Sequence, residues 1–429
     1  MRITHVLTRL IVGGAQENTI ASVLGLRKIA GLEVDLISGP TTGPEGSLES
    51  TLVADDVRKR IAADSPTDRL LMSVATNETV SLSPSDGERA GVRGIQPPIL
   101  TILPELVRPV HPWNDIIALR KLTQLFRERK PDIVHTHSGK AGVLGRLAAA
   151  RAGVPLIVHT IHGPSFGAFQ GDLANRIFRT AERRAARVTT HFVTVADAMR
   201  DQYLAAGIGR PEQYTRIFSG FPLEPFLQTK NDPALRARYG LKPDDIVIGK
   251  IARLFKLKGH DSLFVIAPQL VRACPQIKFL LVGDGEWRSR FEQMARAAGL
   301  EKHFVFTGLV PPAEIPSLLG IMDILVHLSE REGLPRALPQ ALAAGRPIVA
   351  FDCDGAREVC RDGETGFLVR QDHLNGLTER LLLLARDEAL RTRLANQGRE
   401  FVRENFAAEQ MVKRLWELYQ LLGKTASER

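Results

Sequence analysis

The stretch DILVHLSEREGLPRALPQALAAGRPIVAFD, residues 323–352, decides the fold class. Its two ends, 323–328 and 346–352, are short apolar runs of the kind found in buried strands. Between them the pattern predicts a loop and then a helix, with Pro335 near its first turn and Gly345 just past its end. Because strand, helix and strand follow one another directly, the stretch predicts a parallel β-sheet covered by helices.

The same alternation of strand-like and helix-like segments runs along most of the chain. The strand-like runs are 3–8, 32–38, 132–137, 155–160 and 191–195 in the first half, and 246–252, 278–284, 303–308, 323–328 and 346–352 in the second. This pattern predicts an α/β protein with two Rossmann-like, doubly wound domains. A chain of 429 residues is also too long for one ordinary hydrophobic core.

The expected domain boundary is a segment rich in proline and turn-forming residues, 219–233. We therefore assign residues 1–224 to a first domain and 225–408 to a second. Residues 51–97 lack regular periodicity, and we interpret them as an insertion in the first domain, either a surface loop or a lid. Apolar residues recur at helical spacing in 409–422, which predicts an amphipathic last helix.

Composition and charge restrict the classes of partner. The formal net charge of +9 favours anionic partners, such as nucleotide-linked substrates or an acidic membrane face. Aromatic residues make up only 6% of the chain, too few for a stacking platform, so we expect no nucleic-acid partner. Three cysteines, no signal-peptide core and no apolar run of roughly 18 residues predict a protein of the reducing cytoplasm.

The loop inside the quoted stretch carries the strongest chemical signal. The backbone N–H groups of Gly333 and Leu334, at the predicted helix start, would form an anion site at the C-terminal edge of the sheet. Glu332 would project beside them, where a carboxylate suits sugar hydroxyls because it repels phosphate. Arg253 and Lys258 follow another strand and suit a diphosphate.

Glycine turns mark the same edge of both predicted sheets. Gly283 in LVGDGE, and the turn FTGLV that ends at Val310, would leave backbone groups exposed to a nucleotide base. In the first half, Gly13 and Gly14 follow the first strand, where a loop can approach a phosphate or a sugar. These turns support a ligand site but are individually weak signals.

Two motifs of the first half, HTHSG and HTIHG, place histidines at strand ends. We expect His135 and His159 to point into the packed interior, and His137 and His162 to face a polar cleft. A zinc site is conceivable, but spacings of two and three residues in extended segments match no metalloprotease pattern. We therefore expect no metal.

Taken in order, these motifs resemble family 4 of the retaining glycosyltransferases, which have the GT-B architecture. The matching segments are Gly13–Gln16, HTHSGKAGVLGRLAA, HTIHG, Arg253 with Lys258-Gly259, LVGDGE, FTG, SEREGLPRALPQALAAGRPIVA and GAREVCRDGETGFLV. The resemblance covers nearly the whole chain outside 51–97, and its HTHSGKAGVLGRLAA form is similar to enzymes of capsular and O-antigen polysaccharide assembly. It implies two domains that face a central cleft, and a last helix that returns to the first domain.

The resemblance also implies roles at matching positions. Glu332 would contact the donor sugar with His162 nearby, and Arg253 and Lys258 would clamp the diphosphate. The donor and nucleotide site would consist of Gly14, Gly283, Val310, Gly333, Leu334 and Gln340. The donor would be a nucleoside-diphosphate sugar, the acceptor a glycan or a lipid-linked glycan, and no cofactor would be needed.

One position departs from the family pattern. Gln340 stands where the family has a second glutamate that holds the ribose hydroxyls. Its amide oxygen still accepts a hydrogen bond, but a charge-assisted bond is roughly twice as strong as a neutral one. We therefore expect weaker or differently selective ribose binding, and not a loss of catalysis.

Two further segments need an interpretation. Asp352-Cys353-Asp354 has the Asp-x-Asp pattern that binds metal in another glycosyltransferase fold, but we interpret it as a structural turn before Gly355. Residues 175–187 contain five arginines and one glutamate. They predict a basic helix that either docks on an anionic membrane or forms a solvated face.

With this resemblance, the sequence predicts a cytoplasmic hexosyltransferase, peripheral to the membrane if the basic helix docks there. The resemblance implies retention of the anomeric configuration by a same-face mechanism, in which the leaving phosphate takes the acceptor's proton. Two alternatives remain open: an epimerase of nucleotide sugars with the same fold, and a non-catalytic nucleotide-sugar binder in which Gln340 is a sign of decay.

Overall fold

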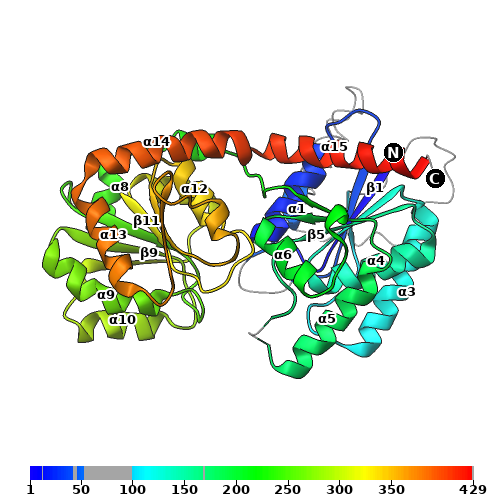
Figure 1. Ribbon diagram of the computed structural model, residues 1–429, viewed down its shortest axis with the longest axis horizontal. Coiled ribbons are helices and arrows are strands. Elements are labelled where there is room, and N and C mark those ends of the chain that lie inside the picture. The colour runs from blue at the N-terminus through cyan, green and yellow to red at the C-terminus, as the bar shows by residue number, and fades with distance from the viewer. Residues whose placement is uncertain (12, 42–45, 53–98, 168–169, 428–429) are drawn as a thin grey trace, which may run out of the picture.

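The computed structural model describes residues 1–11, 13–41, 46–52, 99–167 and 170–427. Two α/β halves lie side by side, and helices α14 and α15 run along one side of the molecule from the second half to the first (Figure 1). Nearly all of the predicted insertion, 51–97, lies outside the described residues, so its interpretation as a loop or a lid stays a prediction.

The first half is built on a seven-stranded sheet with the order β3-β2-β1-β4-β5-β6-β7. Its strands are β1 (Arg2–Leu7), β2 (Glu33–Ser38), β3 (Leu100–Ile102), β4 (Ile133–His137), β5 (Leu156–Ile161), β6 (His191–Thr194) and β7 (Tyr214–Arg216). Its helices are α1 (Gly14–Leu26), α3 (Pro112–Arg129), α4 (Gly139–Ala152), α5 (Asp172–Ala186) and α6 (Asp197–Ala205).

The second half is built on a six-stranded sheet with the order β10-β9-β8-β11-β12-β13. Its strands are β8 (Ile246–Ile251), β9 (Ile277–Val282), β10 (Phe304–Gly308), β11 (Ile324–His327), β12 (Ile348–Phe351) and β13 (Gly366–Val369). The helices from here on are α7 (Glu224–Leu227), α8 (Pro233–Arg238), α9 (His260–Ala273), α10 (Arg288–Ala297), α11 (Ile315–Gly320), α12 (Ala337–Ala343), α13 (Leu374–Arg386), α14 (Glu388–Asn405) and α15 (Ala408–Ser427).

All pairings between these strands are parallel, so the predicted fold class of two doubly wound α/β domains is confirmed. In each sheet the strand order reverses between two central strands, β1 and β4 in the first and β8 and β11 in the second. Ligands of open α/β sheets bind at such reversal points, beyond the C-terminal ends of the strands. Of the ten predicted site residues, Arg253, Lys258, Glu332, Gly333 and Leu334 lie in the loops after β8 and β11, and Gly14 begins the helix after β1.

Helix α15 packs on the first half. Its apolar side chains join the core beneath α1. Gly25 of α1 permits this contact, because a Cβ atom there would come within 2.3 Å of Cγ2 of Val412. The hydroxyl of Tyr419 also shares a hydrogen bond of 2.5 Å with Nδ1 of His135 in β4.

The two halves also meet at the loop between β11 and α12. Arg331 donates a hydrogen bond of 2.8 Å to the carbonyl oxygen of Pro164, and Arg336 forms an ion pair with Glu17 of α1. At Gly333 the backbones are so close that a Cβ atom would lie 1.8 Å from the carbonyl oxygen of His162. This loop therefore holds the C-terminal edges of the two sheets against each other.

The close approach at Gly333 makes a testable prediction. In Gly333→Ala the added methyl group would meet a backbone carbonyl that cannot rotate away, so the loops must separate. Overpacking of this kind costs about 1–3 kcal/mol, so we expect a thermal unfolding midpoint several degrees below that of the wild type. Gly171→Ala is the control, because a Cβ atom there meets nothing within 4 Å. A wild-type midpoint for Gly333→Ala would contradict this description of the contact.

Candidate functional site

The loops after β8 and β11 lie directly against each other. Gly259 is left-handed, with φ of 66°, and a Cβ atom there would lie 1.7 Å from the carbonyl oxygen of Leu328. The N–H group of Glu330 donates to the carbonyl oxygen of Leu257 at 3.0 Å. The predicted Lys258-Gly259 turn is therefore seated on the loop that contains Glu332.

Lys258 and Glu332 form an ion pair at the centre of this contact. The Nζ atom of Lys258 lies 2.5 Å from Oε1 of Glu332, and both side chains are 22% exposed. Burial would raise the pKa of Glu332, but the charge and the hydrogen bond of Lys258 outweigh burial, and the pKa is lowered. Glu332 is therefore a carboxylate at neutral pH, held at the C-terminal edge of the second sheet.

The backbone of Glu332 is fixed by the Asp-x-Asp turn. Oδ2 of Asp354 accepts a hydrogen bond of 2.8 Å from the N–H group of Glu332, and Oδ1 accepts one of 2.6 Å from Gln202 of α6. Asp352 is bound by the guanidinium of Arg357 at 3.0 Å. The interpretation of this segment as a structural turn is confirmed, and Asp354 has the added role of linking the Glu332 loop to the first half.

The helix after Glu332 begins later than expected, because Pro335 lies two residues before its first residue and not in its first turn. Helix α12 begins at Ala337, so Gly333 and Leu334 lie in the loop and not at the helix N-terminus. Pro335 disfavours helical backbone at Leu334, which keeps the residues before the proline out of the helix. The N–H groups of Gly333 and Leu334 donate to no other group in the described part of the chain. An anion site formed by these two groups stays a prediction.

The glycine turn of β9 lies beside the β8 loop. A Cβ atom at Gly283 would come within 2.4 Å of the carbonyl oxygen of Ala252 and 3.7 Å of the backbone nitrogen of Arg253. The Arg253 side chain is exposed, with its guanidinium 5.7 Å from the ring of Phe255. Gly283, Arg253, Lys258 and Glu332 therefore share one edge of the second sheet.

Gln340 and Val310 are less closely tied to this group. Gln340 is half-buried on α12, and its side chain forms no hydrogen bond with the residues that the structure describes. Val310 is half-buried and packs against a hydrophobic cluster that includes residues of both halves. Their roles in nucleotide binding stay predictions, as do the roles of Gly14, Gly283, Gly333 and Leu334.

A buried lysine beneath the ion pair was not recognised from the sequence. Lys250 lies in β8, is only 1% exposed, and its Nζ atom has no hydrogen-bond partner among the described residues. Burial and the charge of Lys258 lower its pKa to about 7, although Glu332 and Cys353 act in the opposite direction. The available signal was a lysine in the otherwise apolar run IVIGKIA.

On the first-half side of the contact lie Gly14 and His162. A Cβ atom at Gly14 would come within 2.9 Å of the Arg336 side chain, so the β1 loop lies next to the β11 loop. His162 is half-buried and lines a cavity of about 570 Å³ in the first half. Other polar residues that line this cavity include Gln16, Ser138, Lys140 and Ser165.

The four histidines are only partly as expected. His135 and His159 are buried, as predicted, and burial lowers the pKa of each well below its usual value. The expectation that His137 faces a cleft is wrong, because it is 1% exposed and its Nδ1 atom shares a hydrogen bond of 3.1 Å with Nε2 of His162. His137 shares its side of β4 with His135, two residues away, and packs against that ring, with centroids 4.4 Å apart.

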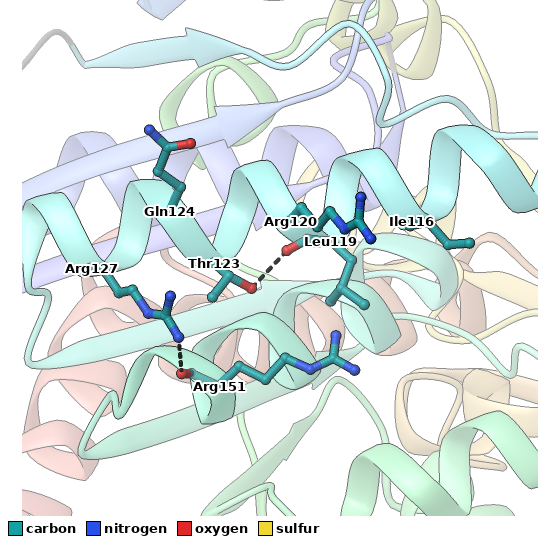
Figure 2. A pocket seen from close by; sticks show the side chains of 7 residues that line it. All are labelled: Ile116, Leu119, Arg120, Thr123, Gln124, Arg127 and Arg151. Carbon is teal, nitrogen blue, oxygen red and sulfur yellow. Dashed lines mark hydrogen bonds between the residues drawn. The ribbon is translucent and has the colours of Figure 1, made fainter.

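A second hollow, of about 600 Å³, lies on the outer surface of α3 and α4 (Figure 2). Arg120, Arg127 and Arg151 are among its lining residues, and Arg127 donates to the carbonyl oxygen of Arg151 at 3.2 Å. None of the predicted site residues lines this hollow. We therefore place the candidate site at the facing sheet edges and not here.

Known proteins are similar to this chain over both halves. A galactosyltransferase of Escherichia coli, named UDP-Gal:alpha-D-GlcNAc-diphosphoundecaprenol alpha-1,3-galactosyltransferase, is 28% identical over 324 residues, which are 74% of this chain and 82% of that protein. The capsular polysaccharide biosynthesis glycosyltransferase CapM of Staphylococcus aureus is 24% identical, over 80% of this chain and 90% of CapM.

Solved structures show the same fold. The Anabaena protein Alr3699/HepE, crystallised with UDP and glucose, superposes with a TM-score of 0.74 at 19% identity, covering 98% of this chain and 99% of that one. Residues 30–219 match the model of the glycosyl transferase 4-like domain, and residues 231–401 match that of glycosyl transferases group 1. The chain therefore belongs to the GT-B glycosyltransferases of the family 4 type.

Proposed function

We propose that this glycosyltransferase moves a sugar, with retention of configuration, from a nucleoside-diphosphate sugar to a lipid-linked glycan in cell-surface polysaccharide assembly. The observation that carries the proposal is the Lys258–Glu332 ion pair. A diphosphate carries more negative charge than one carboxylate and competes for Lys258. Once Lys258 turns to the phosphate, Glu332 is free to accept hydrogen bonds from the donor sugar.

The cations at this edge would stabilise the negative charge that the reaction creates. Negative charge develops on the leaving diphosphate in the transition state, and Lys258 with the exposed Arg253 would stabilise it there. The lowered pKa of Glu332 keeps it charged throughout, so it acts as a hydrogen-bond acceptor and not as an acid. We assign no step to a metal or a cofactor.

The carboxylates of the 570 Å³ cavity support a same-face mechanism. Of the residues that line it, Glu182 is buried and bound by Arg146 and Ser165, and Asp115 is paired with Lys140. Both carboxylates are therefore occupied by cations or donors, which does not suit a nucleophile. Retention then follows if the leaving phosphate takes the acceptor's proton on the same face of the sugar.

The same cavity suits a lipid-linked acceptor. His162 and Ser138 line it together with the apolar side chains of Val110, Ile177 and Phe178, and with Arg108. Sugar hydroxyls would meet the polar residues, a diphosphate the cations, and a lipid the apolar rim. The name of the Escherichia coli relative gives an acceptor of this chemistry, GlcNAc-diphosphoundecaprenol.

Exposed apolar side chains on α3, on α5 and in the loop before α3 favour peripheral contact with a membrane. Trp113 and Leu173 are 73% and 75% exposed, and the other exposed apolar residues of these segments are Val110, Ile116, Ile117 and Ile177, of which Val110 and Ile177 line the cavity. Helix α5 adds Arg176, Arg179, Arg183 and Arg184, which attract anionic lipids. No helix in the described ranges is long and apolar enough to cross a bilayer. We therefore propose a cytoplasmic enzyme that rests on the inner membrane face.

The ion pair is tested by measuring binding and transfer separately. We expect Lys258→Met to remove most of the preference for UDP or GDP over the matching monophosphate in calorimetric titrations, because the lysine no longer meets the second phosphate. We expect Glu332→Gln to bind UDP normally but to transfer sugar at least about 100-fold more slowly. Lys256→Met, on the same loop and exposed, is the control and should match the wild type. Transfer at the wild-type rate by Lys258→Met and Glu332→Gln would overturn the assignment.

Membrane contact is tested by co-sedimentation with vesicles of phosphatidylglycerol and phosphatidylcholine. We expect the double variant Leu173→Ser, Ile177→Ser to bind at least about tenfold more weakly, because two apolar side chains no longer enter the lipid. Binding should also weaken as salt is raised. Val265→Ser, at an exposed position of α9, is the control. Equal binding by the double variant and the wild type would contradict docking through α5.

A further inference from the structure

Three histidine rings form a row that leads inward from the cavity. Nε2 of His162 lies 3.1 Å from Nδ1 of His137, and Nε2 of His137 lies 2.9 Å from Nδ1 of His5. The ring planes are nearly parallel, at 28° and 15°, and the ring centroids are 5.3 Å and 5.2 Å apart. In each pair, the distance between the ring centroids exceeds the distance between the bonded nitrogens by about two ring radii. The rings therefore meet edge to edge, and each hydrogen bond lies in the planes of the two rings that it joins.

Hydrogen bonds of this kind couple the tautomers of the three rings. Burial lowers the pKa of His162 to about 4 and that of His5 to about 3, and it holds the pKa of His137 well below its usual value. Each ring is therefore neutral at pH 7, with one N–H donor and one bare acceptor nitrogen. A proton on one nitrogen of His5 then decides which nitrogen carries the proton in His137, and in turn in His162.

The inner end of the row decides between the two possible sets of tautomers, in which the protons of all three rings point either outward to the cavity or inward. Nε2 of His5 is buried and has no hydrogen-bond partner in the described part of the chain. A buried N–H group without an acceptor is rarer and more costly than a bare acceptor. His5 therefore carries its proton on Nδ1 and donates to His137. His137 donates from its Nδ1 to Nε2 of His162, and His162 is left with its proton on Nδ1.

Neighbouring groups do not compete for these protons. Both ring nitrogens of His135 are engaged, Nδ1 by Tyr419 and Nε2 by Thr160, and Nδ1 of His159 is engaged by Thr136. Ring nitrogens of His5, His135 and His137 lie within 4.8 Å of one another, as in a metal site. A metal ion would have to break the hydrogen bonds that His135 and His137 make, so the geometry fits the hydrogen-bonded row better.

We propose that His5 and His137 are positioning residues that present His162 to the cavity as a hydrogen-bond donor through its Nδ1–H group. The inference rests on the proposed function, since it specifies what His162 offers to a sugar or acceptor oxygen. A donor at this place stabilises negative charge and cannot take the acceptor's proton. That task remains with the leaving phosphate, in keeping with the same-face mechanism.

The tautomer is measured directly on the intact protein, without activity. In protein labelled with ¹⁵N-histidine, two-bond ¹H–¹⁵N correlations show which nitrogen of each of the 11 histidines carries the proton. The signal that disappears in His162→Asn identifies the ring. We expect the neutral Nδ1–H form of His162 at pH 7. An Nε2–H form or a protonated ring would overturn the proposal, even if the enzyme transfers sugar as proposed.

Kinetics test the positioning role. We expect His137→Phe, which keeps the ring volume and removes the hydrogen bonds, to lower kcat about 10- to 100-fold with KM for the donor nearly unchanged. His137→Gln, whose amide still donates, should recover part of this loss. His191→Phe, a buried histidine of β6 outside the row, is the control and should keep the wild-type kcat per folded molecule. Equal kcat values for His137→Phe and the control would overturn the positioning role, whatever the donor proves to be.

Discussion

The candidate site depends on the ion pair between Lys258 and Glu332. Its two side chains are mostly removed from water, so each charge requires the other for as long as no ligand is present. Asp354 fixes the backbone of Glu332 and also binds Gln202 of the first half. The carboxylate is thus held in a fixed position between the two sheets. The flexible side chain of Lys258 can leave it and bind a more highly charged anion, such as a diphosphate.

The two sides of the site have different electrostatic character. The second half offers Arg253, Lys258 and the buried Lys250 around one carboxylate, an arrangement suited to a diphosphate. The first half offers His162, which burial keeps neutral, in a cavity whose carboxylates are already bound. Charge in the second half is therefore gathered around the Lys258–Glu332 pair, while the acceptor side combines a neutral histidine and apolar side chains with the cations Arg108 and Lys140.

Much of this architecture could be predicted from the sequence, because apolar runs of strand length alternate regularly with helical segments. The edge strands β3, β7 and β13 are not among the predicted runs: β3 and β7 have three residues each and no fully buried position, and β13 has only four residues. Helix α12 begins two residues beyond Pro335, although proline is common in a first helical turn, and no pattern in the sequence separates these two starts. The pairing of Lys258 with Glu332, 74 residues later, depends on how two loops pack, and periodicity carries no information about that.

The most direct test of the central claim is a crystal structure of this protein with UDP or GDP, chosen as the nucleotide that binds more tightly. If Lys258 exchanges its carboxylate for the donor's diphosphate, its Nζ atom will lie within hydrogen-bond distance, about 3 Å, of a phosphate oxygen. Glu332 will then be separated from Lys258 and directed toward the place of the donor sugar. A nucleotide bound elsewhere, with the Lys258–Glu332 pair unchanged, would contradict the account.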